Sequence, residues 1–153
     1  MPEISNIEIA SFEDFDGIIE LLESVKVPTD GINPDFTTFY IFRDKTSKII
    51  ACIGLELFTG TALLRSLAVD QKHQRNNLGH RLVYKLLEEA NEAGTKAVYV
   101  CTAKVPGFFL KHGFTNIDLD DVPAEIRNSG LFRVGCPSVA AYMMRKTNCV
   151  NNR

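Results

Sequence analysis

The sequence lacks the features that would place the protein in a membrane, outside the cell or on nucleic acid. None of its apolar runs approaches the roughly 18 continuous residues that a membrane-spanning helix requires. The N-terminal stretch has neither the basic start nor the apolar run of a secretory signal. The net charge is −2 at pH 7, whereas domains that bind nucleic acid usually carry a basic face. We therefore expect a cytoplasmic protein that binds neither membrane nor nucleic acid.

The spacings that typify metal sites and disulfide frameworks are also missing. The four cysteines are Cys52, Cys101, Cys136 and Cys149. No two of them form a CxxC pair, and the first two lie inside apolar runs, so we expect reduced thiols that act as small hydrophobic residues. The three histidines are His73, His80 and His112. Because they are scattered along the chain, we expect them on helix surfaces or loops and predict no metal site.

Two familiar phosphate loops are absent, since the sequence has no GxxxxGK[ST] and no GxGxxG after a strand. A strand, a polar turn and a helix are present instead over residues 61–92. Residues 61–69 are mostly apolar, residues 70–77 include no apolar side chain, and apolar residues recur at helical spacing from Leu78 onward.

The start of this helix has the properties of an anion site. Its first backbone N–H groups lack carbonyl partners, and the helix dipole adds about half a positive charge there. Gly79 lets a ligand approach the backbone, and Asn77 tolerates the left-handed conformation that would turn the preceding peptides inward. Positive charge near the turn comes from Lys72, Arg75 and Arg81. These features predict a pyrophosphate site.

The turn resembles the acetyl-CoA-binding motif of the GNAT N-acetyltransferases, in which a strand precedes Q/R-x-x-G-x-G/A. Residues 74–80 read QRNNLGH. In the register that starts at Gln74, Asn77 replaces the first glycine and Gly79 is the second; in the register that starts at Arg75, Leu78 replaces the first glycine. We prefer the first register because it keeps Gly79 and puts a turn-tolerant residue first. A second segment, FFLKHGF at residues 108–114, resembles the family helix that ends in x-G-F.

This resemblance implies a single GNAT domain over residues 1–153, with acetyl-CoA as co-substrate and no metal. The implied fold is mixed α/β: a mostly antiparallel twisted sheet, flanked by helices, with a parallel splayed pair of strands at the acetyl-CoA site. The implied coenzyme-binding residues are Leu67, Ala68, Val69, Gln74, Arg75, Asn76, Asn77, Leu78, Gly79, His80, Phe108 and Phe109.

The residue pattern predicts elements that agree with this fold. The predicted strands are residues 7–10, 37–43, 49–58, 61–69 and 97–102, one that opens at residue 114, and 138–145. The predicted helices follow residues 11, 77, 105 and 122. The strand, helix and strand from residue 61 to residue 102 predict a right-handed parallel crossover.

Acetyl transfer to an amine needs an oxyanion donor, a base and an acid. The resemblance points to the backbone N–H of Leu67 as the oxyanion donor, and to Val69 as a contact of the pantetheine arm. Glu56 is the candidate base because it lies within the apolar run of residues 53–58, where a carboxylate is costly unless it is paired or functional. The alternative is that Glu56 lies on a solvated face of its strand.

The acid is less clearly indicated. Many family members use a tyrosine four residues before the glycine that ends the helix, and Phe109 occupies that position. Phenylalanine cannot donate a proton. Cys101 and Tyr142 are the candidate replacements, together with Tyr99, and water is the remaining alternative.

The acceptor is expected to be a small amine. Arg65, Ser66, Arg127 and Arg133 are candidate contacts, because an arginine can clamp a carboxylate with two hydrogen bonds; the alternative for each arginine is a surface salt bridge. The segments VPAEIR and CPSVAA resemble the amino-acid N-acetyltransferase branch of arsenic-resistance operons, which implies an amino acid or an analogue. A non-catalytic acyl-CoA sensor and a protein acetyltransferase remain alternatives, and the family makes a homodimer plausible.

Overall fold

In the computed structural model, which describes residues 4–102, 106–133 and 141–147, the centre of the protein is a mixed sheet. Within these residues seven strands join in the order β1-β2-β3-β4-β5-β7-β6. The strands are β1 (Glu8–Ile9), β2 (Thr37–Arg43), β3 (Ile49–Leu57), β4 (Thr61–Val69), β5 (Ala97–Thr102), β6 (Thr115–Ile117) and β7 (Ala141–Lys146). All neighbouring pairs are antiparallel except β4 and β5, which are parallel. The predicted fold class is confirmed.

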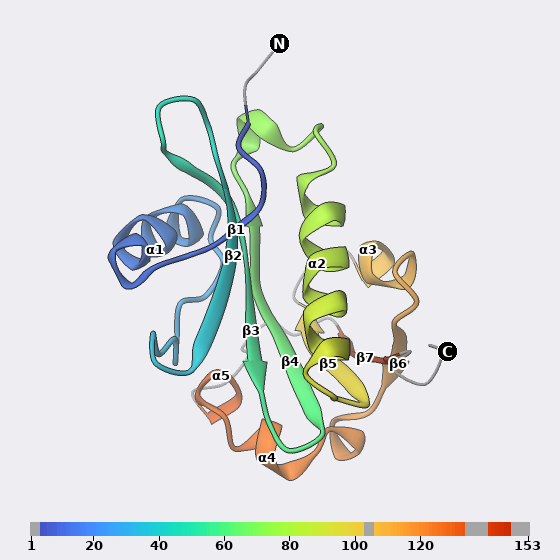
Figure 1. Ribbon diagram of the computed structural model, residues 1–153. Coiled ribbons are helices and arrows are strands. Elements are labelled where there is room, and N and C mark those ends of the chain that lie inside the picture. The colour runs from blue at the N-terminus through green and yellow to red at the C-terminus, as the bar shows by residue number, and fades with distance from the viewer. Residues whose placement is uncertain (1–3, 103–105, 134–140, 148–153) are drawn as a thin grey trace.

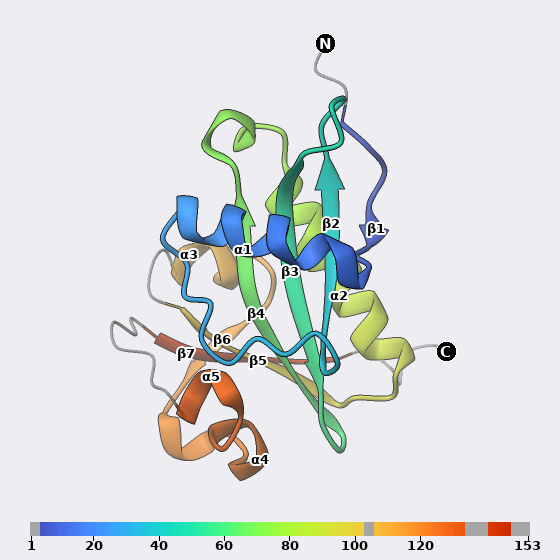
Figure 2. The same cartoon turned by 90° about the vertical axis from the view of Figure 1, so that its left-hand side faces the viewer.

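Helices cover both faces of the sheet (Figures 1 and 2). The two longer ones, α1 (Phe15–Ser24) and α2 (Leu78–Glu92), pack on opposite faces. Side-chain alternation supplies both cores: in β2, Phe39 and Ile41 pack with α1, whereas Tyr40 and Phe42 pack with α2. The shorter helices are η1 (Phe12–Asp14), η2 (Gln71–His73), α3 (Pro106–Leu110), η3 (Leu119–Asp121), α4 (Ala124–Arg127) and α5 (Gly130–Arg133). No helix in the described part of the chain is long and apolar enough to cross a membrane.

The parallel pair of strands separates soon after it forms. β4 and β5 pair only over three positions, from Thr61 with Ala97 to Leu63 with Tyr99. Beyond this point β4 continues along β3, and β5 continues along β7. The carboxyl-terminal halves of β4 and β5 therefore splay apart, as predicted, toward the end of the sheet at which the polar turn leaves β4.

A bulge in β4 lies in this splayed half. Cys52 pairs with Ala68 and Gly54 pairs with Arg65, so Ile53 faces two residues of β4, Ser66 and Leu67. Ser66 has a positive φ of 58°, which is uncommon for a residue with a side chain. The extra residue changes which side chains of β4 face α1, and it leaves Leu67 without a paired residue in the β3 register.

Some elements differ from the sequence prediction. The first helix opens with the 3₁₀ turn η1 before α1 begins at Phe15. The helix α5 is not predicted, because its four residues are too few to show a period. The last strand is β7, and residues 138–140, with which it was predicted to begin, lie outside the described residues. Cys136 and Cys149 also lie outside them.

Candidate active site

The polar turn between β4 and α2 is held by its own residues. Asn77 has the left-handed conformation, with φ 59° and ψ 21°, immediately before α2 begins. The side-chain Nε2 of Gln74 donates a hydrogen bond to the carbonyl oxygen of Val69, 3.1 Å away, which ties the turn to the end of β4. Leu78 is buried, whereas Arg75 and Asn76 are exposed. The first turn of α2 is thus fixed with its N–H groups beyond the end of β4.

Three segments converge at Gly79. A Cβ atom at this position would lie 3.4 Å from the ring of Phe108 in α3 and 3.9 Å from a methyl group of Val69. Both distances are those of ordinary van der Waals contact, so α2, α3 and the end of β4 pack together at this position. Phe109 is buried, with its ring against those of Phe108 and Phe114. The structure thus brings Val69, Gly79 and Phe108 together, all predicted to contact the coenzyme, and places Phe109 in the core.

Two histidines meet beside these residues. His80 Nδ1 and His112 Nε2 are 2.8 Å apart and share a hydrogen bond, and the ring of His80 lies on Phe108 at 4.8 Å. His112 is buried, contrary to the expected surface position. Burial lowers the pKa of His112, and the charges of His80 and Arg145 lower it further. The pairing of these two histidines, 32 residues apart, has no signal in the sequence.

Glu56, the candidate base, is buried within the sheet on the α1 face. Its side chain is 2% exposed, which excludes the solvated alternative. Thr37 Oγ1 donates a hydrogen bond of 2.6 Å to Glu56 Oε2 from the paired position on β2. Arg65 Nη1 lies 3.5 Å from the same oxygen. All the hydrogen bonds given to this carboxylate by the described residues reach Oε2 rather than Oε1.

Arg65 is also buried, and its guanidinium bonds to residues of the protein. Besides Glu56, it donates to Ser66 Oγ at 2.9 Å and to the carbonyl oxygen of Asp30 at 2.6 Å. Ser66, in turn, accepts a weak hydrogen bond from the Cys52 thiol through its carbonyl oxygen. Burial raises the pKa of that thiol. Arg65 and Ser66, both predicted acceptor contacts, are therefore bonded to each other beside Glu56.

Cys101 and Tyr142, the candidate acids, are paired across β5 and β7. Both pack against the cluster of buried residues that contains Leu63 and Tyr99. Leu63 is two residues from Arg65 along β4, so the two side chains share a face of the sheet. Cys101 and Tyr142 therefore lie on the same face as Glu56, across the splayed strands. Burial, with a smaller contribution from Asp121, raises the pKa of Tyr99.

The remaining predicted acceptor contacts lie on the short helices of this face. Arg127 ends α4 and Arg133 ends α5, and both are exposed. Between them Ser129 is 8% exposed, and its buried Oγ has no hydrogen-bond partner in the described structure. An unpaired buried hydroxyl is costly, which makes Ser129 a candidate ligand contact that sequence reasoning missed. The only signal would have been its position two residues after Arg127.

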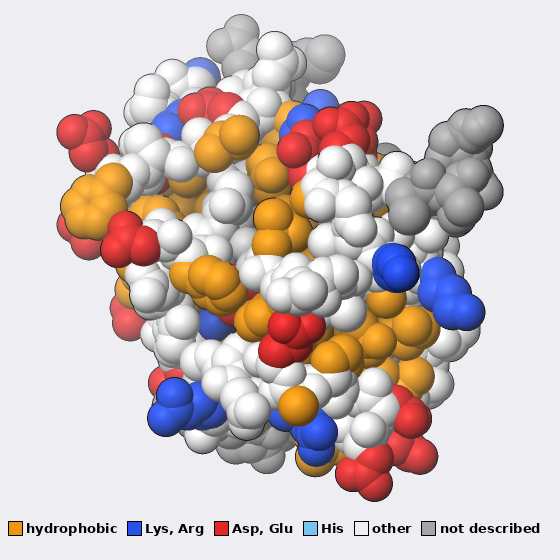
Figure 3. Space-filling view, turned by 60° about the horizontal axis from the view of Figure 1, so that its bottom comes forward, with side chains coloured by type: hydrophobic (Ala, Val, Ile, Leu, Met, Phe, Trp, Pro, Cys, Tyr) orange, Lys and Arg blue, Asp and Glu red, His pale blue; other side chains and the backbone are white. Residues whose placement is uncertain are grey.

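Figure 3 views the end of the molecule at which α4 and α5 lie. On this face Lys and Arg side chains are dispersed among Asp and Glu, and apolar side chains reach the surface in several places. The large apolar residues with substantial exposure include Phe36, Leu57 and Leu119. Phe36 makes an edge-to-face contact with Phe58 at 5.4 Å. The charge on this face is therefore mixed rather than gathered in one basic area.

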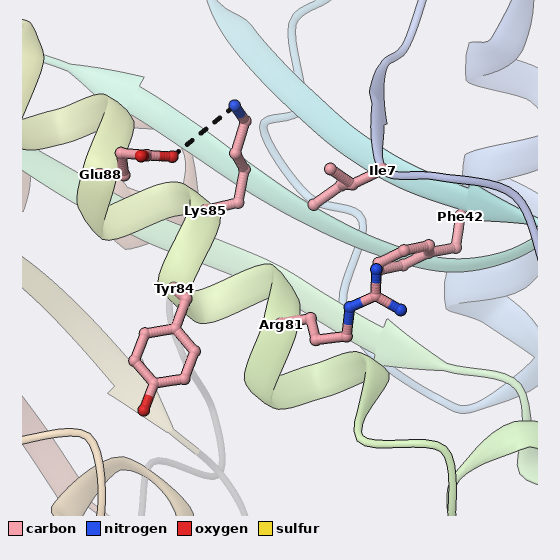
Figure 4. Close-up of a pocket in the computed structure, with 6 residues that line it drawn as sticks. All are labelled: Ile7, Phe42, Arg81, Tyr84, Lys85 and Glu88. Carbon is pink, nitrogen blue, oxygen red and sulfur yellow. Dashed lines mark ion pairs between the residues drawn. The ribbon is translucent and has the colours of Figure 1, made fainter.

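A groove of about 490 Å³ lies on the other side of the sheet (Figure 4). Its lining residues are Ile7, Phe42, Arg81, Tyr84, Lys85 and Glu88. Arg81 lies over the ring of Phe42 at 4.7 Å, and Lys85 forms ion pairs with Glu88 and Glu89. The groove contains none of the candidate catalytic residues.

Comparisons with known proteins agree with this geometry. A family model described as the acetyltransferase (GNAT) family matches residues 2–114. An amino-acid acetyltransferase of Aeromonas salmonicida is 26% identical over 125 residues, a match that covers 76% of this chain but only 28% of that protein.

Solved structures share the fold. A GNAT-family acetyltransferase from Staphylococcus aureus Mu50 has a TM-score of 0.76 at 19% identity, and the match covers 94% of this chain and 99% of that one. N-acetylglutamate synthase from Neisseria gonorrhoeae, solved with coenzyme A and N-acetyl-glutamate, has a TM-score of 0.76 at 18% identity, and the match covers 94% of this chain and 35% of that one.

Proposed function

Because the chain belongs to the acetyltransferase (GNAT) family, we propose that it transfers the acetyl group of acetyl-CoA to the amino group of a small molecule, an amino acid or an analogue. The observation that carries this proposal is Glu56, a carboxylate buried next to the splayed strands and bonded by Thr37 and Arg65. A carboxylate in this position is costly unless it is paired or functional. The Aeromonas relative, whose name is amino-acid acetyltransferase, supports the acceptor class.

The coenzyme is proposed to bind where β4, α2 and α3 meet. Its pyrophosphate would accept hydrogen bonds from the first N–H groups of α2, which begins directly after the left-handed Asn77. Arg75 and Asn76 are exposed and free to approach it, and Val69 and Phe108 would contact its apolar arm. The hydrogen bond from Gln74 to the carbonyl oxygen of Val69 holds the turn against the end of β4.

The proposed reaction has three steps at the thioester carbonyl. The neutral amine attacks the carbonyl carbon and forms the C–N bond, and Glu56 takes the amine proton through a water molecule. The backbone N–H of Leu67, in the bulge of β4, would donate to the oxyanion. The C–S bond then breaks, and the leaving thiolate receives a proton, for which Cys101, Tyr142 and water are the candidate donors.

The acceptor is proposed to bind on the face that holds Glu56. Arg127 and Arg133 are exposed and could pair with its carboxylate, and the unpartnered hydroxyl of Ser129 could donate to it. Arg65 is a less direct candidate, because it bonds Glu56, Ser66 and the Asp30 carbonyl. We assign Arg65 a positioning role, in which it fixes the carboxylate of Glu56.

A non-catalytic acyl-CoA sensor is the second candidate function. Phe109 favours it, since this residue occupies the position of the family tyrosine and is buried in the core. Glu56 is paired with Arg65 and bonded by Thr37, so its burial alone does not decide between the two functions, and a test of turnover does.

Coenzyme A release distinguishes the two functions. Free thiol would be monitored with acetyl-CoA and each common amino acid, its phosphinic analogue or its arsenical analogue. We expect turnover with one carboxylate-bearing amine, and a fall in kcat of about 10² or more in Glu56→Gln. Glu13→Gln, which changes an exposed carboxylate, is the matched control and should retain the wild-type rate.

The affinity for acetyl-CoA is the second measurement that separates the enzyme from the sensor. Acetyl-CoA should bind the wild-type protein and Glu56→Gln with similar affinity, because Glu56 is proposed to act on the amine. Tight binding of acetyl-CoA with no release in the presence of any acceptor would contradict the proposed enzyme and favour the sensor.

A further inference from the structure

Two segments meet in backbone contact on the face that holds Glu56. One is the loop of residues 25–36, which joins α1 to β2, and the other is the start of α5. A Cβ atom on Gly31 would overlap the carbonyl carbon of Gly130 and lie 2.8 Å from its Cα atom. A Cβ atom on Gly130 would lie 2.9 Å from the carbonyl oxygen of Gly31. Only glycine at both positions allows this approach.

Both sides of the contact are anchored. On the loop side, the carbonyl oxygen of Asp30 accepts a hydrogen bond of 2.6 Å from Arg65, the same side chain that pairs with Glu56. On the α5 side, Leu131 is buried in the cluster that also contains Leu63. The contact therefore lies one residue from an anchor in each segment, and one of the two anchors is the ion-pair partner of the proposed base.

The Gly31–Gly130 contact adjoins a residue that is proposed to bind the acceptor. Ser129, with its unpartnered buried hydroxyl, directly precedes Gly130. A bound polypeptide needs room for a whole backbone, and even adjacent strands lie about 4.8 Å apart. No such space exists where the backbones of residues 31 and 130 touch.

We infer that the Gly31–Gly130 contact is a specificity determinant that limits the acceptor to a single free amino acid or an analogue of that size, and excludes the terminus or side chain of a polypeptide. The inference rests on the proposed function. An amine that reaches Glu56 does so beside a closed contact between the two segments. A chain that continued from the acceptor carboxyl group would collide with one of them.

Acceptor selectivity tests the inference. The measured quantity is kcat/KM for the accepted amino acid divided by kcat/KM for a dipeptide that begins with the same residue. We expect a ratio above about 100 in the wild-type protein, because a dipeptide that collides with the contact loses binding in the transition state. Gly31→Ala and Gly130→Ala should each lower the ratio at least tenfold, with an unchanged KM for acetyl-CoA.

Gly60→Ala is the matched control. Gly60 has a φ of 79°, close to the 73° of Gly31, but a Cβ atom there would meet nothing within 4 Å. It therefore carries the backbone strain of the Gly31 substitution without the collision, and should leave the ratio unchanged. Amide hydrogen exchange adds a readout that needs no acceptor: exchange in residues 27–36 should rise in Gly130→Ala and stay at the wild-type level in Gly60→Ala.

The outcomes separate the two proposals. If the wild-type protein acetylates the dipeptide as efficiently as the amino acid, or if both glycine variants keep the wild-type ratio, the inference is overturned and acetyl transfer stands. Unchanged exchange of the loop in Gly130→Ala also overturns it. If neither kind of acceptor releases coenzyme A, the proposed function fails, and the inference, which rests on it, is overturned with it.

Discussion

The Glu56 carboxylate is held by two different donors. Thr37 Oγ1 gives it a short hydrogen bond within the sheet, and Arg65 gives it opposite charge at a longer distance. Both hydrogen bonds are accepted by Oε2, and together they fix the orientation of the carboxylate. Hydrogen bonds to charged groups are roughly twice as strong as neutral ones. The orientation of the proposed base therefore depends on Thr37 as well as on Arg65.

Thr37→Val tests this dependence, because valine keeps the shape of threonine and removes the hydroxyl. We expect kcat to fall about tenfold, since one charge-assisted hydrogen bond contributes about 1.5 kcal/mol or more. The KM for acetyl-CoA should not change. Thr38→Val, which alters the exposed neighbour on the same strand, is the control. An equal loss in both variants would show that the effect comes from the strand rather than from the bond to Glu56.

His112 gives the protein a pH-dependent stability. Its pKa lies below the ordinary value because burial disfavours the charged ring and because His80 and Arg145 add positive charge. The folded state therefore binds fewer protons here than the unfolded state. This contribution is complete above about pH 6.5, the ordinary histidine pKa, and is lost as the pH falls through that value toward the lowered pKa.

The free energy of unfolding can be measured by urea denaturation between about pH 7.5 and about pH 5. It should decline with falling pH less steeply in His112→Gln than in the wild-type protein. One proton corresponds to a slope of at most about 1.4 kcal/mol per pH unit. His73→Gln serves as the control, because His73 is a half-buried histidine elsewhere in the chain. Identical slopes in the wild-type protein and His112→Gln would contradict this assignment.

At the scale of the elements, the turn and the first residues of α2 act as one unit. The turn is fixed by the left-handed Asn77 at one end and by the bond from Gln74 to Val69 at the other. α3 packs beside this unit at Gly79, where a Cβ atom would be in ordinary van der Waals contact with the Phe108 ring. Asparagine at residue 77 therefore reverses the chain before the helix, in a conformation that glycine also adopts freely.

Substitutions of Asn77 test whether the turn and the first residues of α2 act together in binding acetyl-CoA. Asn77→Gly should keep the KM for acetyl-CoA within about twofold, since glycine adopts the left-handed conformation freely. Asn77→Val should raise it about tenfold, because a residue that resists this conformation costs about 1–2 kcal/mol. Asn76→Val, beside it in the turn, is the control and should have a small effect. A tenfold rise in both valine variants would point to a general loss of the turn.

How far the sequence predicts these elements depends on the range of the interactions. The strand, turn and helix around residue 77 are predictable because their signals, an apolar run, a polar gap and a helical period, are all local. The pairing of Thr37 with Glu56 follows from the register of a hairpin, which the sequence only approximates. The pairing of His80 with His112 and the contact of Gly31 with Gly130 are not predictable, because each joins segments that only the folded chain brings together.

At the scale of the whole molecule, the two proposed binding regions lie on opposite faces of the sheet, next to the strands β4 and β5 that splay apart. The coenzyme region is at the turn, α2 and α3, and the acceptor region is on the face of α1, α4 and α5 (Figures 1 and 2). The two strands pair over only three positions and then part. The thioester would pass between them to reach the face that holds Glu56.

The measurement that tests this account most directly is the fate of a labelled acetyl group. The protein would be incubated with acetyl-CoA labelled in the acetyl group and with a mixture of free amino acids and dipeptides, and the products would be analysed by mass spectrometry. We expect the label on the amino group of one free amino acid or analogue, in molar excess over the protein. Label that appears only on peptides, or coenzyme that binds without any transfer of label, would contradict it.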